Sequence, residues 1–554
     1  MTSEPASPVD DDIWSRDDEA PSPVARTDEL SLGDGSDRPP AQDDTVTTER
    51  WSRRDRLLGY GIVVAGFVAV VVSLRLNHAG LHESEIATSW QLDSVDNLMA
   101  NPFTSTWYRH VQPPLYNLYI GSILRWSPFP PIGTIYVLSL AVLLGASLLL
   151  CDVLQRWRVH PWAAGLITAV AMANPNLLST IVVSSYEVPV VAMLVLAFWL
   201  FQRYLDQPSP RLLIGLSVVL TAVSLTRSLL HPVWVVGFVA FAVLARKVPV
   251  RTIAVAVAIP VLCIGGWMVK NEVLFDTATT SSWLGFNLQR GVMAPMARAD
   301  VEASVADGDV TGLALVNPWQ PLEQYDEWNE GCQPSSRHPS LYVETWKESG
   351  RAANFNHECY LPLYAQAEAN ATTLIRTYPG RYLRTRVAIA PSSFAMAEVG
   401  VDTPYRSPAG VLRPTRTWMD SLGDATLVPM TVHLDMADWN LPFFGADELT
   451  YRISLTLAAG SLFLLARGLL AAFRLMRQAR RPGMRSWDRD ELMWLLVAGT
   501  AILVIVVGNL IEFGENGRFR ATLDPLLVAL PLGALYRTVA DRVGPETPPD
   551  QLTA

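Results

Sequence analysis

The chain alternates between long apolar runs and polar connections, a pattern that predicts an all-α polytopic membrane protein. A helix needs about 20 mostly apolar residues to cross a bilayer, because each residue advances it by only about 1.5 Å. Ten runs approach that length, so about ten transmembrane helices are expected. They are Leu57–Leu76, Ile132–Val153, Trp162–Val183, Val188–Tyr204, Leu212–Leu225, Leu229–Ala245, Thr252–Val269, Tyr451–Leu475, Leu492–Ile511 and Ala521–Val539.

The positions of Lys and Arg predict how these helices are oriented, because cytoplasmic loops are enriched in both residues. A basic cluster from Arg50 to Arg56 precedes the first apolar run, so the N-terminus is expected in the cytoplasm. With ten spans, the later connections on that side are also basic, and the C-terminus returns there. These connections are Gln155–Arg158, Gln202–Arg211, Arg246–Arg251 and Arg474–Arg485. The sequence thus predicts a multi-pass protein of the plasma (inner) membrane.

This orientation divides the chain into cytoplasmic, membrane and exterior parts. The long exterior segment is hydrophilic and large enough to fold as a soluble domain of mixed structure. The parts are an acidic tail (1–50), an N-terminal transmembrane module (51–269) with a long exterior loop (77–131), the extracytoplasmic segment (270–450), C-terminal transmembrane helices (451–540) and a short cytoplasmic tail (541–554).

Composition and charge agree with this division. Of the 554 residues, 50% are hydrophobic and 17% are charged, which is the balance of a membrane protein with a sizeable polar part. Residues 1–50 hold 14 acids and 4 arginines, so they account for the whole net charge of -10. Such a segment cannot bury enough apolar surface to fold alone, so we expect it to be disordered. The remainder is neutral, and nothing in it indicates nucleic-acid binding.

The four cysteines fall into two groups. Cys151 and Cys263 lie within apolar runs, where a thiol behaves as a small apolar side chain. Cys332 and Cys359 both lie in the exterior segment, where an oxidising compartment favours a disulfide between them over two unpaired thiols. No CxxC spacing is present, so no structural zinc site is expected.

The first exterior loop is much longer than most connections between helices, and long ordered loops commonly carry function. It begins with the acids Glu83 and Glu85, close to the end of the first apolar run. A carboxylate held there can accept a proton as a general base, although two solvated loop acids are an equally good interpretation. The rigid turn His110–Tyr116 ends this loop, and its Pro-Pro pair would hold His110 and Gln112 near the membrane face.

Ionisable residues at the exterior ends of the apolar runs form a second group of candidates. Glu187 begins the fourth run and is a further catalytic candidate, because charged groups inside a helix bundle are usually functional. The alternative for Glu187 is an interfacial carboxylate that reaches into water. Four cations lie at the same predicted face and would suit the phosphate of a lipid headgroup, since Arg binds phosphate with a bidentate fork. They are Arg227, Lys270, Arg518 and Arg520. The alternative for each cation is a side chain that reaches out to the lipid headgroups.

Four short motifs follow one another along this predicted face. They are His82-Glu83-Ser84-Glu85, Gln112-Pro113-Pro114-Leu115-Tyr116, Lys270–Phe275 with Ser282–Leu288, and Glu515 with Arg518-Phe519-Arg520 and Asp524-Pro525-Leu526. In this order they resemble the motifs of the GT-C integral-membrane glycosyltransferases. The branch that looks closest contains the protein mannosyltransferases and the lipid A aminoarabinose transferases. The resemblance spans most of the chain after Leu57 but does not include residues 291–449.

The resemblance implies an inverting glycosyltransferase of cell-wall biogenesis. Its donor would be a polyprenyl-phosphate sugar from the bilayer, and its acceptor a glycan, lipid or protein outside the cell. A first-loop acid would be the catalytic base, and exterior Arg and Lys residues would bind the donor phosphate. His82 stands where the family usually has Asp, so the base is either Glu83, which we favour, or Glu85. Gln112 replaces a common Lys, and His110 or Arg109 would take over its phosphate contact.

Mechanistically, one base is enough for a single displacement that inverts the sugar. No cofactor is required, although a divalent cation held by Glu83 and Glu187 is an alternative. Abundant Ala, Arg, Val and Pro suggest a GC-rich actinobacterial genome, for which arabinose or mannose is the expected sugar. Two rival hypotheses remain: a flippase for a lipid-linked sugar, and a scaffold in which Lys270–Thr450 binds a partner.

Overall fold

A computed structural model provides the fold. It describes residues 51–76, 80–246, 248–293, 296, 298–394, 431–435, 450–480, 487–513 and 516–543. The expected acidic tail at 1–50, the motif residue Glu515 and residues 544–554 of the expected C-terminal tail lie outside the described residues. The described residues all belong to one compact unit.

The described chain is mostly helical, and six of its helices are long and apolar enough to cross a membrane. Two of these helices contain a short π-helical stretch, η1 (Val261–Gly265) and η7 (Leu503–Val507). The six are α1 (Arg53–Leu76), α6 (Pro131–Arg156), α9 (Glu187–Asp206), α12–η1–α13 (Val250–Pro260, then Gly266–Phe275), α20 (Leu455–Ala479) and α21–η7–α22 (Arg489–Ile502, then Gly508–Ile511).

The remaining four apolar runs also become helices, but the expected count of ten spans is not confirmed. One run is broken into two helices that are bent by 54° at the break. If this pair is counted as one span, the total rises from six to seven. Two runs form apolar helices of 15 and 14 residues. The last carries Asp524, Arg537, Asp541 and Arg542 within one helix of 20 residues. These helices are α7 (Pro161–Met172) with α8 (Pro175–Val182), α10 (Pro210–Ser224), α11 (Pro232–Ala245) and α24 (Asp524–Val543).

Proline explains most of these boundaries. α7, α8, α10 and α11 each have proline at one of their first two positions, where its missing N–H costs no helical hydrogen bond. Between α7 and α8, the Asn174 side chain accepts a hydrogen bond from the Asn176 N–H and caps the second helix. The chain therefore restarts a helix in a new direction at this point.

Glycine allows the closest helix contacts in the bundle. α1 packs on α7, and a Cβ added at Gly59 would lie 2.5 Å from the Pro161 carbonyl oxygen. A Cβ at Gly165 would lie equally close, 2.5 Å, to the Gly59 carbonyl oxygen. Only residues without a side chain allow two helix backbones to approach this closely.

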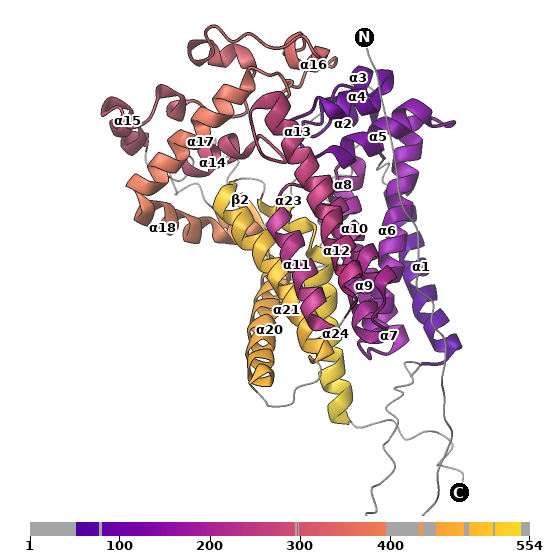
Figure 1. The fold of residues 1–554 in the computed structure, drawn as a ribbon. Coiled ribbons are helices and arrows are strands. Elements are labelled where there is room, and N and C mark those ends of the chain that lie inside the picture. The colour runs from indigo at the N-terminus through magenta and orange to yellow at the C-terminus, as the bar shows by residue number, and fades with distance from the viewer. Residues whose placement is uncertain are drawn as a thin grey trace, which may run out of the picture. The chain divides into compact units, whose positions relative to one another are not determined.

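The first long loop folds into short helices rather than an irregular connection. Ser94 and Asn101 cap two of these helices by accepting hydrogen bonds from backbone N–H groups near the helix starts. The helices are α2 (Glu83–Thr88), α3 (Val95–Ala100), α4 (Pro102–Trp107) and α5 (Pro114–Trp126). Figure 1 shows them at the end of the bundle away from the start of α1.

The described part of the expected extracytoplasmic segment is also mainly helical. Its core is aromatic. A disulfide joins Cys332 to Cys359, as the sequence predicts for an oxidising compartment. Its helices are α14 (Leu284–Met293), α15 (Arg298–Ala306), η2 (Gly312–Leu315), η3 (Leu322–Trp328), α16 (Pro339–Tyr342), α17 (Tyr360–Thr377), α18 (Pro379–Ile389) and η4 (Ala390–Phe394). Later in the chain, β1 (Thr431–Asp435) pairs antiparallel with β2 (Thr450–Ser454), with Thr431 opposite Ser454.

The first loop and this segment are joined by direct hydrogen bonds. The buried Lys347 ammonium donates to the carbonyl oxygens of Ser89 and Leu92. Asn97 of α3 donates to the Glu344 carboxylate at 3.0 and 3.3 Å. The loop and the segment therefore form one continuous structure above the same end of the helices (Figure 1).

Candidate functional site

Three of the predicted site residues meet inside the bundle. Glu187 is the first residue of α9, Arg227 follows α10, and Arg518 belongs to the short helix α23 (Asn516–Ala521). The Glu187 Oε1 atom accepts hydrogen bonds from Arg518 Nε at 2.8 Å and from Arg227 Nη1 at 3.3 Å. All three side chains are buried. Residues that are distant in sequence thus form one ionic cluster, which we call the Glu187 cluster.

Aromatic rings enclose the Glu187 cluster. The Tyr186 ring centroid lies 5.1 Å from the Arg227 guanidinium carbon and 5.3 Å from that of Arg518. The Phe519 ring lies 4.8 Å from the Arg227 guanidinium carbon. Tyr116, from the Pro-Pro turn, packs edge-on against Tyr186 with a centroid distance of 5.7 Å. These cation–π contacts orient both guanidinium groups and exclude water from around them.

Two guanidinium groups share one carboxylate in the Glu187 cluster. Within the described structure, the buried Nη2 atom of Arg227 and Oε2 atom of Glu187 have no hydrogen-bond partner. A buried polar group without a partner costs about 1–3 kcal/mol. The unused Arg227 donor, beside a second guanidinium group, suits an additional anion.

The first long loop reaches the Glu187 cluster through Gln91. In the amide orientation that satisfies its neighbours, the Gln91 oxygen accepts hydrogen bonds from Arg518 Nη1 at 3.1 Å and Nη2 at 2.8 Å. The same amide donates to the Ser89 hydroxyl at 3.1 Å. Gln91 follows α2, the helix that carries Glu83 and Glu85, so a short stretch of chain links this helix to the Glu187 cluster.

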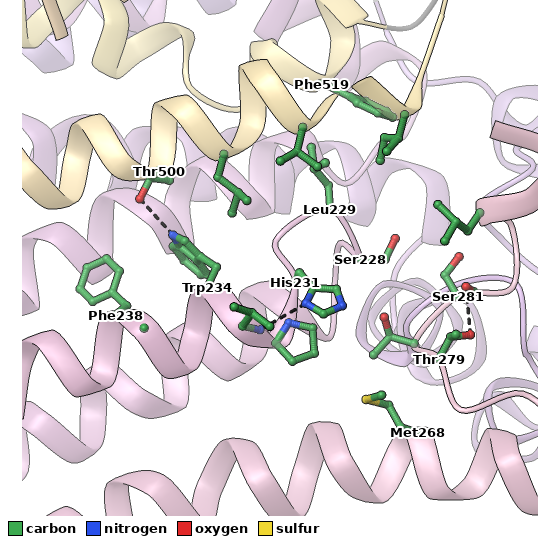
Figure 2. Close-up of a pocket in the computed structure, with 18 of the residues that line it drawn as sticks. Ser228, Leu229, His231, Trp234, Phe238, Met268, Thr279, Ser281, Thr500 and Phe519 are labelled. Carbon is green, nitrogen blue, oxygen red and sulfur yellow. Dashed lines mark hydrogen bonds between the residues drawn. The ribbon is translucent and has the colours of Figure 1, made fainter. Parts of the chain in front are cut away.

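An apolar cavity of about 630 Å³ lies beside the Glu187 cluster. Its walls come from α11, α13, α14 and the α21–η7–α22 helix. Figure 2 shows Trp234 and Phe238 at its apolar end, and Ser228, Thr279 and Ser281 at a more polar end. Trp234 donates to Thr500 at 3.1 Å and so ties α11 to α21. Phe519 lines the cavity and also packs on Arg227, so the cavity and the Glu187 cluster share a wall.

The other cations that the sequence suggested do not join this cluster. The Lys270 ammonium donates to the Arg109 carbonyl oxygen at 2.9 Å and lies 3.6 Å from the centre of the Trp267 ring. Arg520 pairs with Asp524 at 2.7 Å, and the amides of Asn174 and Asn176 donate to the same carboxylate. Lys270 and Arg520 each bind local partners, and these contacts hold neighbouring parts of the chain together.

The residues of the Pro-Pro turn are buried in the junction between loop and segment. Nδ1 of His110 lies 2.8 Å from the Ser282 hydroxyl, and Nε2 lies 3.0 Å from the Asn356 carbonyl oxygen. Burial lowers the pKa of His110 to about 3, so the imidazole is neutral at physiological pH. Gln112 is also buried. His110 therefore holds two parts of the chain together.

The two first-loop acids lie on α2. Glu83 is exposed at the first position of this helix, and Glu85 is half-buried at its third position. The His82 side chain caps the helix by accepting from the Ser84 N–H. Both acids remain candidate bases. In the described part of the chain, no three or more His, Cys, Asp or Glu side chains are grouped so as to hold a metal ion.

Comparisons of the chain with protein-family models, with curated proteins and with solved structures found no match. The candidate site therefore depends on its own geometry. Sequence reasoning missed Gln91, Tyr186 and Phe519, which contact the arginines. Two of them are sequence neighbours of predicted residues, since Tyr186 precedes Glu187 and Phe519 lies between Arg518 and Arg520. Gln91 carried no signal beyond its place in the long loop.

Proposed function

We propose that this chain is an inverting glycosyltransferase that moves a sugar from a polyprenyl-phosphate donor to an extracytoplasmic acceptor. The observation that carries the proposal is the Glu187 cluster beside the apolar cavity of about 630 Å³. A lipid-linked sugar has the matching parts, namely a long apolar chain, a phosphate and a polar sugar.

Charge supports the phosphate assignment. A phosphodiester carries one negative charge, and in the Glu187 cluster two guanidinium groups share a single carboxylate. Arginine is the side chain that binds phosphate oxygens with two parallel hydrogen bonds. The unused Nη2 donor of Arg227 supplies one such bond, and Glu187 fixes the orientation of both guanidinium groups. In this proposal Glu187 is a positioning residue, because its Oε1 atom is already bound by both arginines.

The isoprenoid chain would occupy the apolar cavity, whose wall residue Phe519 contacts Arg227. In the reaction, the acceptor hydroxyl oxygen attacks the anomeric carbon while the bond from that carbon to the phosphate oxygen breaks. The phosphate leaves with the bonding electrons and is stabilised by Arg227 and Arg518, which is electrostatic catalysis. Glu83, or alternatively Glu85, takes the hydroxyl proton.

The test is transfer by the purified chain in lipid nanodiscs. Radiolabelled polyprenyl-phospho-arabinose and polyprenyl-phospho-mannose serve as donors, with a cell-wall fraction as acceptor. Wild type is compared with Glu83→Gln and Glu85→Gln, and Glu330→Gln is the control because Glu330 is an exposed acid elsewhere. We expect one loop variant to lose at least about a hundredfold in rate, the usual contribution of a general base, while the control keeps full activity. Equal transfer by all variants would remove both loop acids from the mechanism.

A second candidate function is movement of a lipid-linked sugar between leaflets. The observation that favours it is the 54° break between α7 and α8, since transporters commonly bind substrate where membrane helices are interrupted. The same nanodisc preparation, moved into liposomes, separates the two functions. Lipid movement without transfer from either donor supports a flippase, and transfer without movement supports the glycosyltransferase.

A further inference from the structure

Trp90 lies half-exposed in the first loop, directly before Gln91. The residue is 39% exposed, although two aromatic rings pack against its indole. Trp319 stacks on it with a centroid distance of 5.9 Å and an interplanar angle of 23°. Phe355 meets it edge-on at 5.0 Å. The Trp90 ring is therefore a flat apolar surface held rigidly by the segment behind it.

The residue that supports this ring has a strained backbone. Trp319 has φ of 69°, in the left-handed region that bulky side chains rarely adopt. Trp283 and Phe286 pack edge-on against the same indole, at 4.9 and 5.5 Å. Strain of this kind costs about 1–3 kcal/mol and is concentrated at ligand-binding and active sites. Here the strained residue fixes the plane of Trp90.

The charged groups near Trp90 are of both signs, and Arg109 Nη2 donates to the Trp90 carbonyl oxygen at 3.0 Å. Lys347 donates to the carbonyls of Ser89 and Leu92, on either side of Trp90 in the chain, and thereby brings residues 344–348 next to it. Glu348 accepts from the Val95 N–H at 2.8 Å, and Glu344 accepts from Asn97. An aromatic face beside carboxylates suits a sugar, whose C–H face stacks on the ring while its hydroxyls donate hydrogen bonds.

Charge narrows the ligand further. Arg109 and Lys347 are basic, whereas Glu344 and Glu348 are acidic. Because side chains of both signs favour neither an anionic nor a cationic glycan, the ligand class is neutral. A protein partner fits less well, because Glu and Asp are depleted from the cores of protein–protein interfaces. The loop also connects this surface to the proposed reaction centre, because Gln91 accepts hydrogen bonds from Arg518.

We propose that Trp90, backed by Trp319, is the binding platform for a neutral glycan that serves as the acceptor. The role of this glycan as the acceptor rests on the proposed glycosyltransferase function, whereas its binding to Trp90 does not. The platform holds the glycan chain while its terminal hydroxyl extends toward the Glu187 cluster. Acceptor selection thus belongs to the first loop and the aromatic core behind it.

Binding is measured by titration calorimetry on the purified chain in nanodiscs, with no donor present. The probes are short neutral oligosaccharides of mannose and of arabinose. We expect one of them to bind wild type, and Trp90→Ala to weaken it about tenfold, as loss of one stacking ring commonly does. Trp90→Phe should keep part of the affinity, because a smaller ring remains. Trp126→Ala is the matched control, since Trp126 is a 54% exposed indole at the end of α5.

Several results would overturn the inference. They are no binding of either oligosaccharide, equal binding by Trp90→Ala and wild type, or an equal loss in Trp126→Ala. Because no donor is present, the outcome is independent of transfer. Binding that depends on Trp90 without any transfer activity would count against the proposed function alone. Transfer that does not depend on Trp90 would count against the platform alone.

Discussion

At the scale of single residues, the Glu187 cluster buries one carboxylate and two guanidinium groups, which are costly to remove from water. The position of Glu187 at the start of an apolar helix was enough to mark it as a functional candidate from the sequence. Its pairing with Arg227 and Arg518 was not predictable, because these residues are 40 and 331 positions away. The sequence also grouped Lys270 and Arg520 with them, whereas the structure gives both of these cations separate partners.

Replacing Glu187 by Gln should destabilise the protein strongly. The substitution removes the carboxylate that two buried guanidinium groups share, and breaking a buried ion pair costs about 3–5 kcal/mol. Glu302→Gln is the matched control, because Glu302 pairs with Arg298 at 2.8 Å and both side chains are about half exposed, at 52% and 53%. Loss of a solvated pair costs about 1 kcal/mol or less. Thermal unfolding in detergent measures both, and equal shifts would contradict the account.

Glu344 should make stability fall as pH rises from about 5 to about 7. Burial, assisted by the Asp93 carboxylate, raises the pKa of Glu344 to about 7. The unfolded carboxyl loses its proton near 4.5, so the folded state binds more protons across this window and is weakened as they leave.

Lys347 does not interfere with this test. Burial lowers its pKa to about 7, and the unfolded amine titrates near 10.5. Its effect therefore falls above pH 7, where stability rises with pH as the buried charge is lost. The lowered pKa of His110 makes stability rise with pH up to about 6.5 in both proteins, so the difference between them is the test. Between pH 5 and about 7, the unfolding temperature of wild type should fall relative to that of Glu344→Gln. An identical slope in both proteins would show that this carboxyl does not titrate as described.

At the scale of elements, the sequence predicted where helices form better than where they end. Apolar runs became helices throughout the described chain, because backbone groups in a bilayer must bond within their own segment. Proline then divided or shortened several runs, as at Pro175 and Pro232. The short helices of the first loop were not predicted, since α2, α3 and α4 have six residues each and no extended periodicity.

Gly59 should be the residue that tolerates substitution least within α1. A methyl group there would lie 2.5 Å from the Pro161 carbonyl oxygen, so α1 and α7 would have to separate. Gly61 is the matched control in the same helix, because a Cβ there meets nothing within 4 Å. Gly59→Ala should lower the unfolding temperature, whereas Gly61→Ala should be neutral or stabilise by about 0.5–1 kcal/mol. A similar effect of both substitutions would contradict the close packing of these helices.

At the scale of the whole molecule, the structure joins three parts that the sequence treated separately. The first loop, the segment from α14 to η4 and the C-terminal α23 all meet at one end of the bundle (Figure 1). The sequence predicted the exterior side of these parts from loop charges alone. It had no information on their contacts, because each contact joins residues far apart in the chain.

Cysteine labelling tests the predicted orientation. Asp307 and Gln207 are both exposed, the first in the expected exterior segment and the second in a connection expected in the cytoplasm. In a chain with Cys263 replaced by Ser, Asp307→Cys should react with a membrane-impermeant maleimide in intact cells. Gln207→Cys should react only after the membrane is opened. The reverse pattern would place the Glu187 cluster on the cytoplasmic side.

The central claim is that the Glu187 cluster holds a lipid phosphate, and direct binding tests it best. Native mass spectrometry of the purified chain with polyprenyl phosphate would compare wild type, Arg227→Ala and the control Arg337→Ala. Arg337 is an exposed arginine that donates to the Leu274 carbonyl oxygen. We predict retained binding in wild type and the control, and a loss of about tenfold or more in Arg227→Ala, the size of one charge-assisted hydrogen bond. Equal binding by all three proteins would contradict the account.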